Sequence, residues 1–263
     1  MAIKWKLSLV YPEADWYAEI RFEHRKGGAA VTGIRAENLT RSYTMGENII
    51  KAVDDISFTI PEGKYTIILG ASGAGKSTVL NLLGGMDSPT SGRLWVAGQE
   101  ISGYNKHRLA EYRRNNIGFV FQFYNLMANL TMLENVELAS QICKNPLNPK
   151  DALEMVGLGE RTNNFPAQCS GGEQQRGAIA RALAKNPDIL LCDEPTGALD
   201  YKTGKAILAL LYELCRKSGK TVVVVTHNGA LAPTADVLMR MKSGKIESFT
   251  ENSDPVPVQD LEW

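Results

Sequence analysis

The sequence predicts an α/β fold built around a parallel β-sheet, on the basis of two observations. Four short runs, at 65–70, 117–122, 188–195 and 221–228, are apolar without strict alternation. Continuous hydrophobicity is typical of strands covered on both faces, as in a parallel sheet. Segments with helical periodicity lie at 77–83, 173–185 and 204–219. Strands followed by helices in this order predict parallel β-α-β units.

Strand-like segments ahead of these units predict a second, smaller sheet. "IRAENLTRSYT" (34–44) and "IIKAVDDISFTIPEG" (49–63) flank a turn at 45–47. Together with "GRLWVAG" (92–98), they are expected to form an antiparallel sheet beside the parallel one.

Residues from about 123 to 180 are mostly helical and interrupt the α/β pattern, so we expect them to form a lobe of their own. The segment "ENSDPVPVQDLEW" (251–263) is polar and contains Pro255 and Pro257. This composition predicts an extended strap or partial disorder.

Composition excludes several classes of function. Lys plus Arg is 29 and Asp plus Glu is 29, so the formal net charge is zero. A balanced chain has no global electrostatic attraction to nucleic acid or to an anionic membrane. The four cysteines form no CxxC pair, which is typical of a reduced, cytosolic protein. No stretch approaches the ~18 apolar residues of a membrane span.

The segment "GASGAGKS" (70–77) fits the phosphate-loop pattern G-x-x-x-x-G-K-[ST]. It follows an apolar strand and opens a helix, which favours phosphate binding over a simple glycine turn. Backbone N–H groups and the helix N-terminus attract the phosphates. We expect Lys76 to reach the β- and γ-phosphates and the Ser77 hydroxyl to ligate Mg²⁺. The predicted nucleotide-binding loop comprises Gly70, Ala71, Ser72, Gly73, Ala74, Gly75, Lys76, Ser77 and Thr78.

Polar residues end the other apolar runs, where ligands of open α/β sheets bind. Asp193 is expected to hold Mg²⁺, and Glu194 to deprotonate the water that attacks the γ-phosphate. His227 and Gln122 end two further runs. Because its strand belongs to the same sheet, His227 is expected to contact the γ-phosphate, whereas Gln122 by itself is better explained as a solvated strand end.

The stretch "SGGE" (170–173) has two interpretations. Ser170 and Glu173 fit a helix capping box, which is sufficient to begin a helix. A capping box does not require Gly171 and Gly172, however, and bare N–H groups at a helix N-terminus form an anion site. Because the phosphate loop serves its own nucleotide, a second anion site would serve the nucleotide of another copy of the chain.

In order and approximate spacing, these motifs resemble those of ATP-binding cassette (ABC) transporter ATPases over residues 34–245. The resemblance implies a P-loop ABC ATPase fold, with a RecA-like parallel-sheet core, a small antiparallel β subdomain and a helical signature subdomain. It further implies that Tyr43 stacks on adenine, that Gln122 senses Mg²⁺ and the permease, and that His227 is the switch histidine. Segment 170–173 becomes the signature motif acting on the partner's ATP, and Asp200 belongs to the D-loop. Cys169 and Glu173 depart from the usual leucine and glutamine.

Three longer stretches, at 118–139, 193–205 and 225–246, resemble the lipoprotein-release, macrolide-efflux, cell-division and bacitracin-resistance class of bacterial ABC ATPases. That class implies an ATP-hydrolysing subunit with ATP and Mg²⁺ as cofactors. It also implies an ATP-dependent dimer of two copies, and an FtsX-type permease that holds the ATPase at the cytoplasmic face of the membrane, without nucleic acid as a partner. The expected division is 1–33 as an extension of unknown role, 34–245 as the ABC domain and 246–263 as the tail.

Two other functions remain open. One is a mechanotransmission or regulatory ATPase that moves no substrate. The other is a DNA-repair or translation ABC protein, which the single cassette, the zero net charge and the missing coiled-coil insertion disfavour.

Overall fold

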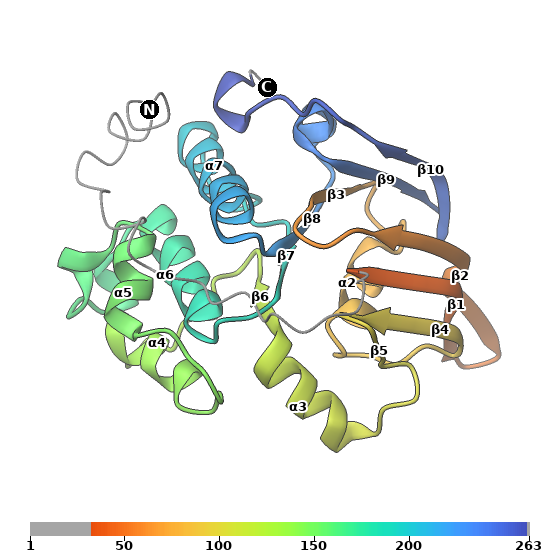
Figure 1. Cartoon of the computed structure of the whole chain (residues 1–263), viewed down its shortest axis with the longest axis horizontal. Helices are drawn as coiled ribbons and strands as arrows, with labels where there is room; N and C mark the ends of the chain where they lie inside the picture. Colours follow the sequence, from red (N-terminus) through yellow and green to blue (C-terminus); the bar gives the residue numbers. More distant parts are fainter. Residues whose placement is uncertain (1–32, 262–263) are drawn as a thin grey trace.

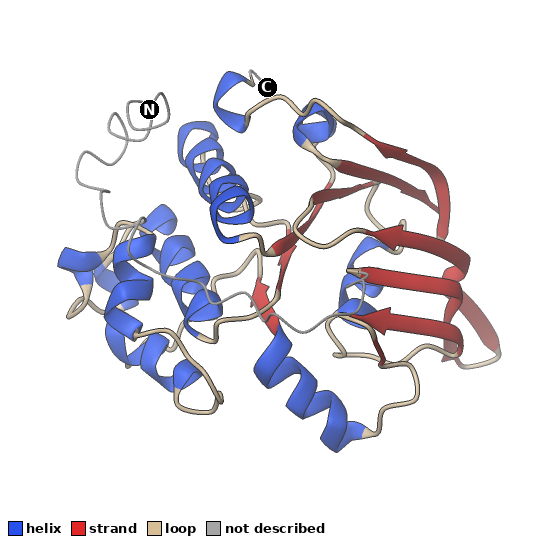
Figure 2. Cartoon of the chain, in the orientation of Figure 1, coloured by secondary structure: helices blue, strands red, loops and turns tan. Residues whose placement is uncertain are grey.

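The computed structural model describes residues 33–261, so the extension expected at 1–33 lies almost entirely outside the described residues. Two sheets organise this part of the chain (Figures 1 and 2). The larger sheet has the strand order β10-β9-β3-β8-β7-β6, and the smaller has the order β2-β1-β4-β5. The predicted α/β fold with an additional antiparallel sheet is confirmed.

The larger sheet is parallel except at β10. Its strands are β3 (Tyr65–Leu69), β6 (Ile117–Val120), β7 (Ile189–Asp193), β8 (Thr221–Thr226), β9 (Val237–Lys242) and β10 (Lys245–Glu251). Every residue of β3 and β8 is buried. The continuous apolar runs therefore form strands covered on both faces, as expected.

Successive residues of β3 face two different cores. Ile67 packs with apolar residues of α6 (Gly171–Ala184) and α7 (Tyr201–Ser218). Ile68 packs instead with α2 (Lys76–Leu83) and with the smaller sheet. Side chains alternate between the two faces of a strand, so the two layers cover opposite faces of the larger sheet.

The smaller sheet is antiparallel and consists of β1 (Ile34–Met45), β2 (Asn48–Ile60), β4 (Ser91–Val96) and β5 (Gln99–Glu100). Leu39, Val53 and Leu94 of this sheet share a core with α2. The helix after the phosphate loop is thus packed against both sheets.

A lobe of helices lies beside the larger sheet, at the left of Figure 1. Its elements are α4 (Met132–Ser140), α5 (Pro149–Met155), η2 (Gly159–Arg161), η3 (Pro166–Gln168) and α6. The remaining helical elements are α3 (Lys106–Asn116), η4 (Gly229–Thr234) and η5 (Val258–Asp260). Within residues 33–261, no helix combines the length and hydrophobicity that crossing a membrane requires.

The C-terminal part of the described chain is anchored in two places. Residues 245–251 form β10, which pairs antiparallel with β9 and places Ile246 and Phe249 against the core of the smaller sheet. Further on, Val258 and Leu261 are buried in the core of α6 and α7, and Lys205 of α7 donates to the Leu261 carbonyl. A few apolar residues spaced along a polar segment anchor it, which its average composition did not predict.

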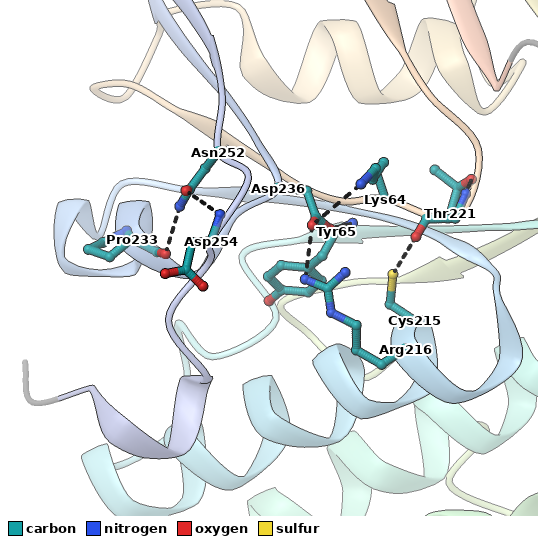
Figure 3. A network of polar contacts seen from close by, with 10 residues as sticks. Lys64, Tyr65, Cys215, Arg216, Thr221, Pro233, Asp236, Asn252 and Asp254 are labelled. Atoms are coloured by element: carbon teal, nitrogen blue, oxygen red, sulfur yellow. Dashed lines mark hydrogen bonds and ion pairs between the residues drawn. The ribbon is translucent and has the colours of Figure 1, made fainter.

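A buried carboxylate connects these elements at the start of β3 (Figure 3). Asp236 accepts a hydrogen bond from the Tyr65 N–H at 2.7 Å and one from Arg216 of α7 at 3.0 Å. Lys64 lies 3.8 Å from the same carboxylate. Asn252, after β10, donates its N–H to the Asp236 carbonyl. This network positions the strand that leads into the phosphate loop.

Candidate functional site

The predicted phosphate loop connects the end of β3 to the start of α2. Gly75 has φ 97°, and a Cβ added there would lie 2.2 Å from the Ala52 carbonyl oxygen of β2. Only glycine combines this backbone conformation with so close an approach. The neighbouring Lys76 is 6% exposed, and its Nζ donates to the carbonyls of Gly70 at 2.8 Å and Ala71 at 2.9 Å. The ammonium group is therefore held against the loop itself.

Two carboxylates, at the last residue of β7 and the residue after it, line the same cavity as the loop. Ser77 Oγ donates to Asp193 Oδ1 at 3.1 Å. Burial raises the pKa of Asp193, and the charge of Glu194 adds to this, whereas the Ser77 hydrogen bond and Lys76 oppose it. Glu194 adopts φ 46°, and its Oε1 lies 2.9 Å from His227 Nδ1. Side chains from the ends of β7 and β8 thus meet beside α2.

The oxygen donors of Ser77 and Asp193 suit Mg²⁺, which prefers oxygen ligands. Among the described residues, no cluster of three or more His, Cys, Asp or Glu side chains forms a metal site. Mg²⁺ commonly binds through one or two protein ligands together with substrate phosphates. The residues present therefore fit a Mg²⁺ ion that arrives with a nucleotide.

A cavity of about 980 Å³ opens over the loop and gathers most of the predicted site residues. Gln122, Asp193, Glu194 and His227 line it together with residues 71–73 and 75–78. Gly70 and Ala74 line a smaller cavity of about 350 Å³ on the β9 side of the loop. Three triphosphate-binding features therefore share one space: a basic side chain, a metal-compatible pair of oxygens and a carboxylate beside a histidine.

Tyr43 is not among the residues that line this cavity. Its hydroxyl donates to Asp87 at 2.7 Å, and the Arg41 guanidinium lies 4.6 Å from its ring centroid. Stacking on adenine stays a prediction. Ala52 of β2, by contrast, lines the cavity. The sequence could not have identified it, because an alanine side chain carries no polar group.

The signature segment (residues 170–173) also lies outside the cavity and begins α6. The Glu173 N–H donates to Ser170 Oγ at 3.3 Å, and the Ser170 N–H donates to Glu173 Oε2 at 2.8 Å, which confirms the capping box. Arg161 Nε lies 3.1 Å from Glu173 Oε1. The Ser170 N–H hydrogen bond, assisted by Arg161, lowers the pKa of Glu173. Glu173 is thus a partly neutralised carboxylate.

Both glycines of this segment have a packing role that sequence reasoning missed. A Cβ on Gly172 would lie 2.3 Å from Thr203 Cγ2, and one on Gly171 would lie 2.8 Å from the Tyr124 hydroxyl. Thr203 lies in the first turn of α7, and its N–H donates to the N-cap residue Asp200. The N-termini of α6 and α7 therefore pack directly together, and close approach alone is sufficient to require small residues.

Comparison with known proteins places these features in a family. The family model for ABC transporters matches residues 53–197. The lipoprotein-releasing system ATP-binding protein LolD of Xylella fastidiosa is 40% identical over 84% of this chain and 95% of its own length. The macrolide export ATP-binding/permease protein MacB of Bartonella quintana is 43% identical over 80% of this chain, but over only 32% of its own length.

A solved structure shows the same fold in an assembled state. It is the dimeric, post-hydrolysis state of the ATP-binding cassette MJ0796, a Methanocaldococcus jannaschii protein, bound to ADP and Pi. This structure has a TM-score of 0.76 and 42% identity, and it covers 83% of this chain and 98% of the MJ0796 chain.

Proposed function

This chain belongs to the ABC transporter family of ATP-binding proteins and is an ABC-type ATPase, and from that premise we propose that it drives an FtsX-type permease by hydrolysing ATP between two copies of itself. One observation carries the proposal. The cavity over the phosphate loop gathers a complete set of hydrolytic groups, whereas residues 170–173 begin a helix outside it. Those residues are therefore available to a nucleotide that another copy binds.

Within the cavity, Lys76 binds the β- and γ-phosphates. Ser77 and Asp193 would hold Mg²⁺, which would offset phosphate charge when bound. Glu194 accepts the proton of the attacking water while the water oxygen bonds to the γ-phosphorus. The bond from that phosphorus to the bridging oxygen breaks, which releases ADP and inorganic phosphate. His227 holds the Glu194 carboxylate in place and contacts the γ-phosphate. Gln122 orients the attacking water and would help to hold the metal.

In the proposed dimer, the signature segment of each chain faces the nucleotide of the other chain. Ser170 and the N–H groups of Gly171 and Gly172 bind the γ-phosphate of the partner's ATP. Asp200 lies close to them because α6 and α7 pack together at their N-termini. The dimeric MJ0796 cassette, which contains ADP and Pi, supports this arrangement.

The permease contact is proposed on the helical lobe. Phe123 is 73% exposed, and Met127, Leu138 and Ile142 are also exposed. Exposed apolar side chains on one lobe are typical of a protein-binding surface. The FtsX type, export as the process, and a position at the cytoplasmic face of the membrane rest on similarity to LolD and MacB. A mechanotransmission module would use the same contact without moving a substrate, and transport by the reconstituted complex separates the two.

ATP-dependent dimerisation tests the proposal. Glu194→Gln removes the base but keeps the side-chain volume, so this variant is expected to dimerise with ATP and Mg²⁺ on size exclusion with light scattering. Adding Ser170→Arg should abolish the dimer while each monomer still binds a fluorescent ATP analogue, because the phosphate loop is unchanged.

The matched control is Asn148→Arg, which removes the N-cap of α5 in the same lobe. Loss of a cap costs about 1 kcal/mol of helix stability, so this control should leave the dimer intact. A stable ATP-dependent dimer in the Glu194→Gln/Ser170→Arg variant would mean that residues 170–173 are only a helix cap.

A further inference from the structure

Gln175 is a buried polar side chain for which neither the phosphate loop nor the signature segment accounts. It lies in the second turn of α6, two residues after the signature segment, and is 0% exposed. Its Nε2 donates to the Pro195 carbonyl at 2.8 Å and to the Phe121 carbonyl at 3.3 Å. Its Oε1 is buried and has no hydrogen-bond partner among the described residues.

The two carbonyls that Gln175 holds flank the catalytic side chains. Pro195 directly follows Glu194, and the Phe121 carbonyl belongs to the peptide group whose nitrogen is that of Gln122. One side chain of the signature helix thus bonds to the backbone beside both Gln122 and Glu194. These two loops also touch, since a Cβ on Gly197 would lie 2.8 Å from Gln122 Nε2.

Stability alone gives no reason for a glutamine at this position. A buried acceptor without a partner costs about 1–3 kcal/mol, which offsets much of what the two donated hydrogen bonds contribute. Methionine has a similar length and volume and carries no amide oxygen to bury. The amide therefore stabilises the geometry of two loops more than it stabilises the fold.

We propose that Gln175 is a positioning residue that couples the partner's nucleotide to hydrolysis in the chain's own site. The proposal rests on the function assigned above to residues 170–173. A helix turn is rigid, so an anion bound at Ser170 fixes the orientation of Gln175 five residues further along α6. Gln175 in turn fixes the peptide groups beside Gln122 and Glu194, so that the base is aligned when the partner's ATP is engaged.

Gln175→Met separates positioning from packing. We expect kcat for ATP hydrolysis to fall about 10- to 100-fold, as a small misplacement of a catalytic group can do. KM for ATP should stay within about twofold and the melting temperature within a few degrees, because the phosphate loop and the core volume are unchanged. In the Glu194→Gln background, Gln175→Met should still dimerise with ATP.

The matched control is Gln174→Met. Gln174 is the preceding residue of α6, and among the described residues its side chain donates to the Cys169 carbonyl, five residues earlier, at 3.0 Å. Because this bond does not reach Gln122 or Glu194, the substitution should leave kcat unchanged. If Gln175→Met does not fold, Gln175→Asn is measured in its place, because it keeps the amide but withdraws it by one methylene group.

The outcomes distinguish this inference from the proposed function. Suppose that the wild-type protein hydrolyses ATP and the Glu194→Gln variant dimerises, so that the proposed function holds. A kcat of Gln175→Met equal to that of wild type would then overturn only the positioning role of Gln175. A kcat that falls only in proportion to lost folded protein overturns it as well. Absence of the Glu194→Gln dimer would instead overturn the proposed function.

Discussion

Gly172→Ala tests whether the second glycine of the signature segment is required by packing. The added Cβ would lie 2.3 Å from Thr203 Cγ2, whereas carbon atoms pack best at about 3.5–4.0 Å. The first turns of α6 and α7 would have to separate by more than about 1 Å, or Thr203 would have to leave its rotamer. Neither change is available without disturbing Asp200, which caps α7.

The expected destabilisation follows from two opposing effects. Overpacking of this kind costs about 1–3 kcal/mol. Alanine is favoured over glycine within a helix by about 1 kcal/mol. The variant should therefore lose up to about 2 kcal/mol, which lowers the melting temperature by several degrees, at about 2–4 °C per kcal/mol for a domain of this size.

The assay is thermal unfolding of four proteins: wild type, Gly172→Ala, Thr203→Ser and the double variant. Serine removes Cγ2 but keeps the backbone N–H that donates to Asp200. The double variant should be at least as stable as Thr203→Ser alone, because the obstacle is gone and the helix propensity of alanine remains. If Thr203→Ser does not restore the stability of Gly172→Ala, the packing argument is wrong.

Further predictions concern the phosphate site, the signature segment and a buried lysine. Lys76→Ala should lower ATPase activity at least about 100-fold, since one phosphate-stabilising donor is typically worth that much; turnover close to wild type in purified protein would overturn the phosphate-loop assignment. Arg161→Ala should weaken ATP-dependent dimerisation of Glu194→Gln about two- to fivefold, as expected for a partly exposed ion pair, and Glu173→Gln should restore it on a size-exclusion titration. Burial lowers the pKa of Lys220 to about 8. Between pH 8 and 10.5 the unfolded chain therefore binds the extra proton, and the unfolding free energy of wild type should rise relative to Lys220→Met by up to about 3 kcal/mol; parallel pH profiles in urea would contradict this.

Local sequence patterns were sufficient to predict those features that involve residues close together in the chain. The phosphate loop, its flanking strand and helix, and the capping box of Ser170 and Glu173 all involve residues within a few positions of each other, and the structure confirms each element. The anchoring of the tail at 246–263 was not predicted. Ile246 and Phe249 are anchored by a core that is made of distant strands, and nothing in the tail itself indicates that partner.

The sequence by itself determined which residues carry the proposed chemistry, through the order and spacing of its motifs. Only the tertiary structure decided which of them meet. Ser77 and Asp193 are 116 positions apart, and Gln175 reaches Phe121 across 54. These contacts depend on the strand order β10-β9-β3-β8-β7-β6 and on the packing of α6 against α7, which no local pattern encodes. For the same reason the sequence showed glycines at 171 and 172, but only the fold brought Tyr124 and Thr203 against them.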